Sequence, residues 1–464
     1  MPVSPSPARP STSLAKVIGA GVVGTTIEWY DFFLYGSAAA LVFNKLFFPA
    51  ADPLVGTMLA FLTFSVGFVA RPVGGIVFGH FGDRVGRKKL LTLSLILMGG
   101  STFLIGLLPT YATLGASAAA ALVTLRFVQG FAIGGEWGGA VLLVAEHGGQ
   151  RRRGLWASMP QAGAPAGNLL ATLVLWTLSL TLSQEAFLSW GWRLPFLLSA
   201  VLVAVGYWIR VSVDESPAFR EAQARAEAER AADARRTERA PLLQVLSRHR
   251  REVLCGMAAR LVENISYYVI TAFALAYAAD TLGMRRDLVL GGLIVANACH
   301  LLAIPAFGAL SDRLGRRPVY LTGTVLMGVF GFVMFPLLET RDAVVVTATL
   351  VAGMVVHALM FGPQAAFFAE MFSTRIRYSG ASFTYQVTNI VGGGLAPIIA
   401  LYLLDRFGSW QPIAIYMASA AVVSALGVLL ARETRGNDME DGTSASQQAE
   451  GTEQVAGTVT APLG

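Results

Sequence analysis

Residues 79–89 read GHFGDRVGRKK, and residues 308–318 read GALSDRLGRRP. Both stretches fit the pattern G-x-x-x-D-R-x-G-R-[KR], and their aspartates, Asp83 and Asp312, lie 229 positions apart. Each stretch is a short charged turn between long apolar segments. Two matching turns in matching places predict a chain built from two related halves.

The composition is that of a membrane protein. Hydrophobic residues make up 54% of the chain and charged residues 14%, whereas a soluble domain carries about 25% charged residues. Mean hydropathy is +0.58. Long continuous apolar runs indicate helices, because only helices and closed barrels cross lipid. We therefore predict an all-α integral membrane protein with twelve spans, at about 16–43, 54–81, 89–108, 114–145, 155–181, 191–213, 252–279, 287–310, 318–338, 343–369, 379–404 and 411–431.

The distribution of Lys and Arg between short loops predicts the orientation. One side of the predicted spans holds twelve of them and the other side holds five. Basic loops stay on the cytoplasmic side, so the richer side, with both matching turns, is predicted to be cytoplasmic. An even number of spans then puts both termini there. The +6 charge is explained by these loops, and no nucleic-acid partner is expected.

The chain divides into five predicted parts. A Pro/Ser-rich tail at 1–14 precedes a six-helix half at 15–213, and a second six-helix half at 251–435 precedes a polar tail at 436–464. Residues 214–250 form a charged cytoplasmic linker, read as a solvated helix or as a regulatory docking site. The two cysteines, Cys255 and Cys299, lie in apolar segments and are expected to be small buried hydrophobes.

Further motifs carry a family resemblance. They are EWYDF at 28–32, ARPVGG at 70–75, RFVQG at 126–130, GGEWGG at 134–139 and GWRLPF at 191–196. With the paired turns, the chain resembles the major facilitator superfamily, and within it the metabolite:proton symporters, such as shikimate, α-ketoglutarate, citrate and proline/betaine carriers. The resemblance implies two pseudo-symmetric bundles in a bacterial inner membrane, alternating access, a functional monomer, and no cofactor beyond the proton gradient.

Ionisable residues at membrane depth are costly, so each marks a pathway or a partner. Glu28 and Asp31 share one face of the first span, and Arg126 lies at a depth that permits a pair with Asp31. In related sugar–proton symporters such an aspartate carries the proton, and the resemblance implies the same for Asp31 here. The alternative is a static salt bridge between the two spans. Glu28 and the central Glu136 are further candidates for proton coupling.

The ligand site is predicted between the halves, near mid-depth. Arg71 lies twelve residues before Asp83, roughly 18 Å along a helix, and Arg260 lies in the seventh span. Arginines suit carboxylate capture, so a small organic anion or zwitterion is expected. Alternatively, both arginines pair with Glu28 or Glu263, and His300, at the repeat position of Arg71, is a packing residue. The predicted substrate-binding set is Tyr35, Arg71, Arg260, Glu263, Tyr267, His300 and Gln386.

The paired turns are predicted to form a cytoplasmic gate. Ion pairs between helix ends would close that side when the site faces out and break when it faces in; the alternative is that these charges only set topology. The predicted gate residues are Gly79, Asp83, Arg84, Gly86, Arg87, Glu146, Arg153, Asp312, Arg313, Gly315, Arg316, Glu370 and Arg377.

The sequence thus predicts a secondary transporter that takes up a small organic metabolite with protons. A proton-driven exporter of the same fold is the alternative, which two arginines from opposite halves disfavour. No nucleotide loop, metal-ligand cluster or G-x-S-x-G motif is found, so an enzyme is not expected.

Overall fold

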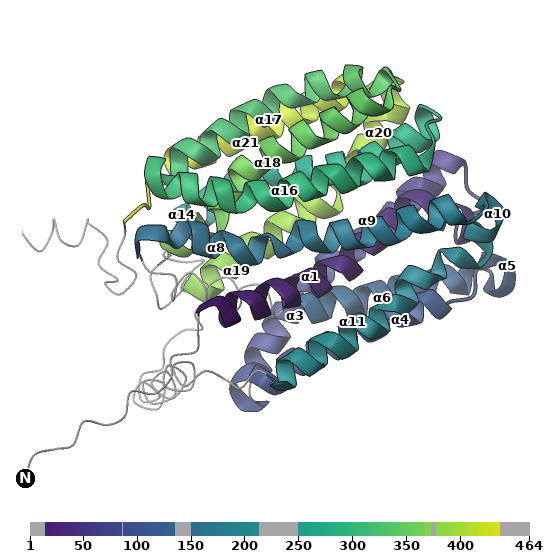
Figure 1. The fold of residues 1–464 in the computed structure, drawn as a ribbon, viewed down its shortest axis with the longest axis horizontal. Coiled ribbons are helices and arrows are strands. Elements are labelled where there is room, and N and C mark those ends of the chain that lie inside the picture. Colours follow the sequence, from purple (N-terminus) through teal and green to yellow (C-terminus); the bar gives the residue numbers. More distant parts are fainter. Residues whose placement is uncertain (1–13, 86, 135–149, 213–248, 373–376, 437–464) are drawn as a thin grey trace, which may run out of the picture.

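The computed structural model describes residues 14–85, 87–134, 150–212, 249–372 and 377–436 (Figure 1). Within these ranges every regular element is a helix. The two tails, Gly86, Glu136, Glu146 and almost all of the predicted linker lie outside the described residues, as do side-chain details of residues 79–91 and of Arg377.

In the described residues of its first half, the chain forms α-helices with two π-helical segments and one 3-10 segment. Their bounds are α1 Leu14–Ala38, η1 Ala39–Phe43, α2 Asn44–Leu46, α3 Pro53–Val85, α4 Arg87–Leu107, α5 Tyr111–Leu114, α6 Ala116–Ile133, η2 Gln150–Arg152, α8 Arg153–Gln161, α9 Gly163–Thr181, α10 Gln184–Ala186, η3 Phe187–Gly191 and α11 Arg193–Ser212.

The described residues of the second half are also helical, with three π-helical segments. Its elements are α14 Arg250–Tyr268, η4 Val269–Phe273, α15 Ala274–Ala276, η5 Tyr277–Thr281, α16 Arg286–Leu314, α17 Arg316–Glu339, α18 Ala343–Met371, α19 Arg377–Thr388, η6 Asn389–Gly394, α20 Ala396–Phe407 and α21 Gln411–Leu430.

The helices carry apolar side chains on their outward faces. Leu302, Val344 and Trp208 are 75%, 77% and 69% exposed, which suits contact with lipid rather than water. Among the described residues, nine helices are long and apolar enough to cross a membrane, and a pair bent by 45°, Gln184–Gly191 with Arg193–Trp208, would make a tenth. The predicted count of twelve spans stays a prediction.

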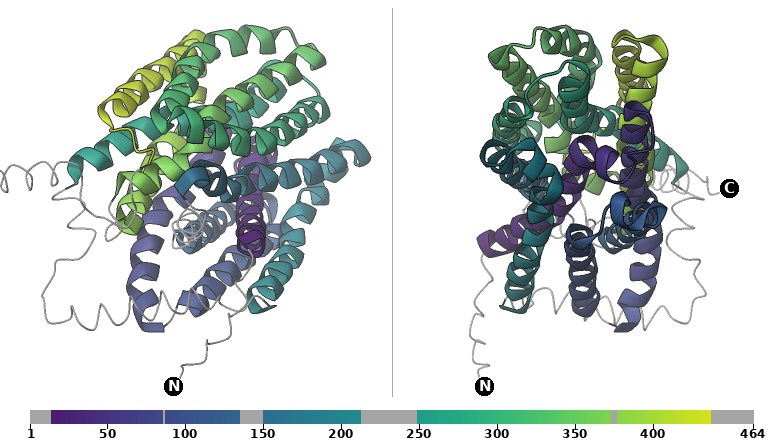
Figure 2. Two further views of the ribbon diagram at one scale, coloured as in Figure 1. Left: turned by 60° about the vertical axis from the view of Figure 1, so that its left-hand side comes forward. Right: turned by 90° about the vertical axis from the view of Figure 1, so that its right-hand side faces the viewer.

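Two bundles lie side by side. Figures 1 and 2 show α1 to α11 in one and α14 to α21 in the other, with α8 and α9 against α16. The 29 residues of α16 span about 44 Å. We call the end of the molecule near Asp312 the Asp312 end, and the opposite end, where Arg286 begins α16, the Lys45 end.

A second contact between the halves joins α3 to η6. Ser65 Oγ donates a hydrogen bond to the carbonyl oxygen of Gly394. A Cβ on Gly393 would lie 2.8 Å from the rings of Phe68 and Tyr268, so only glycine permits this approach. Aromatic rings from both halves fill the centre, where Phe32, Phe68 and Tyr268 pack edge to face.

Candidate functional site

The charged residues predicted inside the spans are buried together near this aromatic centre. Asp31 and Arg126 are 0% exposed, and Glu28, Arg71, Arg260 and Glu263 are at most 7% exposed. Burying a charge is costly unless it is paired or hydrogen-bonded. This cluster of buried charged residues therefore indicates a candidate functional site.

Arg126 is held by polar groups of its own half. Its Nη1 donates to Gln129 Oε1, and its Nε donates to the Phe64 carbonyl oxygen at 3.4 Å. Gln129 Nε2 in turn donates to Thr102 Oγ1 at 2.8 Å. The guanidinium of Arg126 also lies 4.3 Å from the ring centres of Phe32 and Tyr35, a cation–π arrangement.

The predicted Asp31–Arg126 ion pair is not formed in this structure. Both carboxylate oxygens of Asp31 and the Nη2 of Arg126 are buried without a hydrogen-bond partner among the described residues. Arg126 is turned toward Gln129, one helical turn further along α6, and toward the rings. The charges of Asp31 and Arg126 still interact, so the two groups lie in one cluster without direct contact.

Arg71 rests on aromatic rings. Its guanidinium carbon lies 4.2 Å from the ring centre of Phe32 and 5.0 Å from that of Phe68, and its Nε has no hydrogen-bond partner in the described part of the chain. The charge of Glu28 attracts it and that of Arg260 repels it. Two arginines from opposite halves are thus close enough for their charges to interact.

In the second half, Arg260 and Glu263 form an ion pair, which the sequence predicted as the alternative to ligand binding by Arg260. Arg260 Nε lies 3.2 Å from Glu263 Oε2, and its Nη1 donates to the Tyr385 carbonyl oxygen at 2.8 Å. Glu263 also accepts from Gln364 Nε2 at 2.9 Å. His357 Nε2 lies 3.2 Å from Glu263 Oε1, and His357 Nδ1 lies 3.0 Å from His300 Nε2. His300 is therefore part of a polar chain, not only of the packing.

The remaining predicted ligand residues are also buried. Tyr267 OH accepts from Asn168 Nδ2 of the other half at 3.0 Å. Tyr35 OH donates to Thr63 Oγ1 at 2.7 Å, which places Tyr35 in the Arg126 cluster. Gln386 is 5% exposed and its Oε1 has no hydrogen-bond partner among the described residues. The set therefore divides between two neighbouring clusters, one in each half.

At the Asp312 end, the second motif fastens the two halves. Asp312 Oδ1 accepts from Gly154 N at 2.7 Å, and its Oδ2 accepts from Leu155 N at 2.9 Å. These are the amides of the second and third residues of α8, so the carboxylate caps a helix N-terminus of the opposite half. Arg316 Nη1 holds the same Oδ1 at 2.8 Å.

A buried ion-pair network adds to this contact. Glu370 Oε1 lies 3.2 Å from Arg153 Nη1 of the first half and 3.2 Å from Arg316 Nη2 of its own half. Gly154 and Gly308 lie so close that a Cβ on Gly308 would be 2.7 Å from the Gly154 carbonyl oxygen. The halves are therefore in tight polar contact at this end.

Other predicted gate residues behave differently. Arg313 is exposed, and its side chain has no partner in the described part of the chain, so it takes no part in the contact seen here. Gly315 joins α16 to α17 with a φ of +105°, a conformation that favours glycine. Gly79, Asp83, Arg84, Arg87 and Arg377 have backbone positions only, and Gly86 and Glu146 lie outside the described residues.

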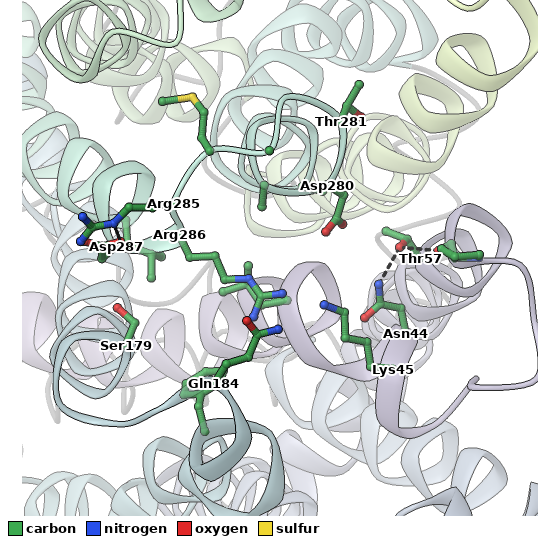
Figure 3. A pocket seen from close by; sticks show the side chains of 18 of the residues that line it. Asn44, Lys45, Thr57, Ser179, Gln184, Asp280, Thr281, Arg285, Arg286 and Asp287 are labelled. Carbon is green, nitrogen blue, oxygen red and sulfur yellow. Dashed lines mark hydrogen bonds and ion pairs between the residues drawn. The ribbon is translucent and has the colours of Figure 1, made fainter.

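The Lys45 end is hollowed by a pocket of about 760 Å³ that both halves line. Figure 3 shows Lys45, Gln184 and Arg286 pointing into the same part of it. The charges of Lys45, Arg286 and Asp280 interact. At its rim, Asp287 hydrogen-bonds Arg285 and raises the pKa of that guanidinium. The molecule is thus fastened at one end and open to a cavity at the other.

The candidate site residues predicted from the sequence did not include several of these residues. His357, Gln364, Asn168, Gln129 and Thr102 are polar groups in apolar spans, which is the one signal that could have marked them. Glu433 was also missed; it accepts from the backbone N–H groups of Arg316 and Arg317 at 2.9 and 3.0 Å.

A comparison with family models matches residues 17–444 to the sugar (and other) transporter family. The chain belongs to this family, in the major facilitator superfamily. This family membership confirms the resemblance found in the sequence, and the many apolar helices confirm a multi-pass membrane protein. The family and the relatives below are transporters, not enzymes.

Relatives of this family member are similar over nearly their whole length. The shikimate transporter of Escherichia coli K12 is 41% identical, over 93% of this chain and 98% of the relative. The inner membrane metabolite transport protein YhjE of the same organism is 42% identical, over 92% and 96%. A crystal structure of a D-xylose-proton symporter superposes with a TM-score of 0.72 at 17% identity, covering 91% of this chain and 99% of that one. This structural similarity to the symporter confirms the all-helical fold of the major facilitator superfamily.

Proposed function

We propose that this protein is a secondary transporter that takes up a small organic carboxylate, or a related zwitterion, together with protons. The observation that carries the proposal is the pair of buried arginines, Arg71 and Arg260, which come from opposite halves and whose charges interact. An anion between them would relieve that repulsion, and guanidinium groups bind carboxylates in a bidentate manner.

The contacts between the halves support alternating access. The Asp312 end is fastened by the Asp312 cap and the Arg153–Glu370 pair, whereas the Lys45 end carries a cavity lined by both halves. We propose that the Asp312 end is cytoplasmic and that the structure corresponds to a state closed on that side. Rocking of the halves would break the Asp312 contacts and open the site inward.

The predicted roles of individual residues enter this proposal. Asp31, Glu28, Glu136 and Arg126 are proposed to couple protons, with the Asp31–Arg126 pair forming in another state of the cycle. Tyr35, Arg71, Arg260, Glu263, Tyr267, His300 and Gln386 are proposed to shape the ligand site.

The architecture proposed is twelve spans with both termini cytoplasmic. It consists of two halves at 15–213 and 251–435 joined by the linker 214–250, in a functional monomer in a bacterial inner membrane. The location named for one relative supports this placement. The exporter alternative is not favoured, since the relatives are a shikimate transporter and a metabolite transport protein, and the fold neighbour is a symporter.

The test is uptake by purified protein in liposomes under an imposed pH gradient. Labelled shikimate, α-ketoglutarate, citrate and glycine betaine form the panel. We expect accumulation of at least one compound that collapses with the gradient. Arg71→Gln should lower that uptake about 10- to 100-fold, the value of one or two charge-assisted hydrogen bonds. Arg285→Gln, an arginine 74% exposed at the rim, is the matched control. Uptake indifferent to the pH gradient would make the protein a facilitator.

A further inference from the structure

Three side chains in the second half form an unbroken hydrogen-bonded chain. Glu263 of α14 meets His357 of α18, and His357 meets His300 of α16, at 3.2 and 3.0 Å. Both histidines are 0% exposed and Glu263 is 3% exposed. Beyond His300 the chain stops, because its Nδ1 is buried with no hydrogen-bond partner among the described residues. A buried polar atom without a partner requires an explanation.

The partners fix where the protons lie. An ionised Glu263 only accepts hydrogen bonds, so His357 must donate to it from Nε2. A neutral His357 then accepts at Nδ1, and His300 must donate from Nε2. This leaves the Nδ1 of a neutral His300 as a bare lone pair, at the atom that has no partner.

We propose that Glu263, His357 and His300 are a proton-binding relay, a second coupling site distinct from the Asp31–Arg126 cluster. This proposal rests on the proposed function and assigns one coupled proton to this half of the molecule. A proton arrives at His300 Nδ1. The Nε2 proton of His300 passes to His357 Nδ1, and the Nε2 proton of His357 passes to Glu263 Oε1. One proton has been added, Glu263 is neutral, and both rings are neutral with their tautomers exchanged.

Proton transfer changes what the relay offers to an anion. Glu263 no longer carries the charge that neutralised Arg260, whose Nε lies 3.2 Å away. At the same time His300 Nδ1 becomes an N–H donor in place of a lone pair. Both changes favour a bound carboxylate, because a buried guanidinium without a counter-charge is costly. Proton and anion therefore bind together, which is the requirement for symport.

The groups around the relay are consistent with a single added charge. The ionisable residues that interact with the relay are Arg260, Tyr267 and Tyr268 of α14, Tyr320 of α17 and Tyr385 of α19. Helix α9, which packs against α16, has no ionisable residue, and Arg153 of α8 is engaged with Glu370. From α3, Arg71 faces Arg260 and is balanced by Glu28. Phenols are neutral at ordinary pH, so Glu263 and Arg260 cancel until a proton arrives.

Histidine tautomers provide a test that needs no substrate. The chain has five histidines, so nitrogen NMR of ¹⁵N-histidine protein can be assigned with His300→Gln and His357→Gln. Between about pH 9 and pH 5, we expect both rings to exchange the Nε2–H form for the Nδ1–H form without becoming imidazolium. Glu263→Gln should lock both rings in the Nε2–H form. An unchanged wild-type spectrum, or a charged ring, would overturn the relay.

Proton uptake on binding links the relay to transport. Shikimate is added to lightly buffered purified protein and the proton uptake is read with a pH electrode. Wild type and the matched control Glu252→Gln, a partly exposed glutamate beside His249, should take up protons equally. Glu263→Gln should take up about one proton fewer per bound shikimate, because the relay adds one proton. Uptake lost in Asp31→Asn but retained in Glu263→Gln overturns the relay and leaves the symport intact. Liposome uptake of shikimate that ignores the pH gradient would instead remove the proposed function.

Discussion

Replacement of Asp312 by asparagine should release the contact between the halves. The carboxylate accepts two backbone N–H groups of α8, at 2.7 and 2.9 Å, and the guanidinium of Arg316 at 2.8 Å. Asparagine keeps the shape but has one acceptor oxygen, and its NH₂ group would face a donor. Each charge-assisted bond is worth about 1.5–3 kcal/mol. Net loss of one, about 2 kcal/mol, shifts the ratio of closed to open molecules about 30-fold.

A cysteine placed in the contact reports this shift. Ser158 is buried on α8 beside Gly308, and cysteine is nearly isosteric with serine. In a background where Cys255 and Cys299 are changed to serine, Ser158→Cys is labelled with a maleimide in membrane vesicles. Asp312→Asn should raise the labelling rate about 30-fold if opening limits the reaction and is rapidly reversed.

The control is Asp287→Asn, an aspartate at the Lys45 end that pairs with Arg285. It removes the same charge without touching the Asp312 contact, so labelling of the reporter should not change. A less than about threefold increase for Asp312→Asn, well below the estimate from the hydrogen bonds, would refute the reasoning. An equal increase for Asp287→Asn would also refute it.

Three further changes probe the contacts between the halves. Gly308→Ala places a Cβ 2.7 Å from the Gly154 carbonyl oxygen, so overpacking of about 1–3 kcal/mol should speed labelling of the same reporter; an unchanged rate would mean that the helices slide apart freely. Gly393→Ala places a Cβ 2.8 Å from the Phe68 ring and should lower the melting temperature in a dye-based thermal scan, whereas an unaltered midpoint would show that η6 yields. Asp83→Asn, the equivalent change in the first motif, should also speed labelling, and the idea of a two-motif gate fails if the rate stays at the wild-type value.

The general architecture could be predicted from the sequence because membrane spans depend on long apolar runs. The same runs that predicted helices form them here, and the repeated motif correctly indicated family membership. Counting residues from Asp83 and Asp312, with the rise of an α-helix, placed Arg71 and His300 well inside their helices. Both side chains are buried in the structure, and their depth in the membrane stays a prediction.

Partner choice could not be predicted in the same way. Spacing gives depth but not the direction in which a long side chain turns, so the contact of Arg126 with Gln129 in place of Asp31 was missed. The partners of His357, Glu263 and His300, come from two other helices, so spacing along one span could not reveal them. The partner of Asp312 was hidden for a different reason, since it is backbone rather than side chain.

That backbone partner has a consequence for how the gate can change over evolutionary time. Any residue except proline at position 155 supplies the same N–H to Asp312, and position 154 is restricted by space, not by chemistry. Substitutions at Leu155 can therefore accumulate without any compensating change at Asp312. A search for correlated substitutions between the two halves would find no signal at this contact, although the proposed transport cycle depends on it. In the contact between Asp312 and α8, only the Asp312 carboxylate has to be inherited as a side chain, because its partner is backbone.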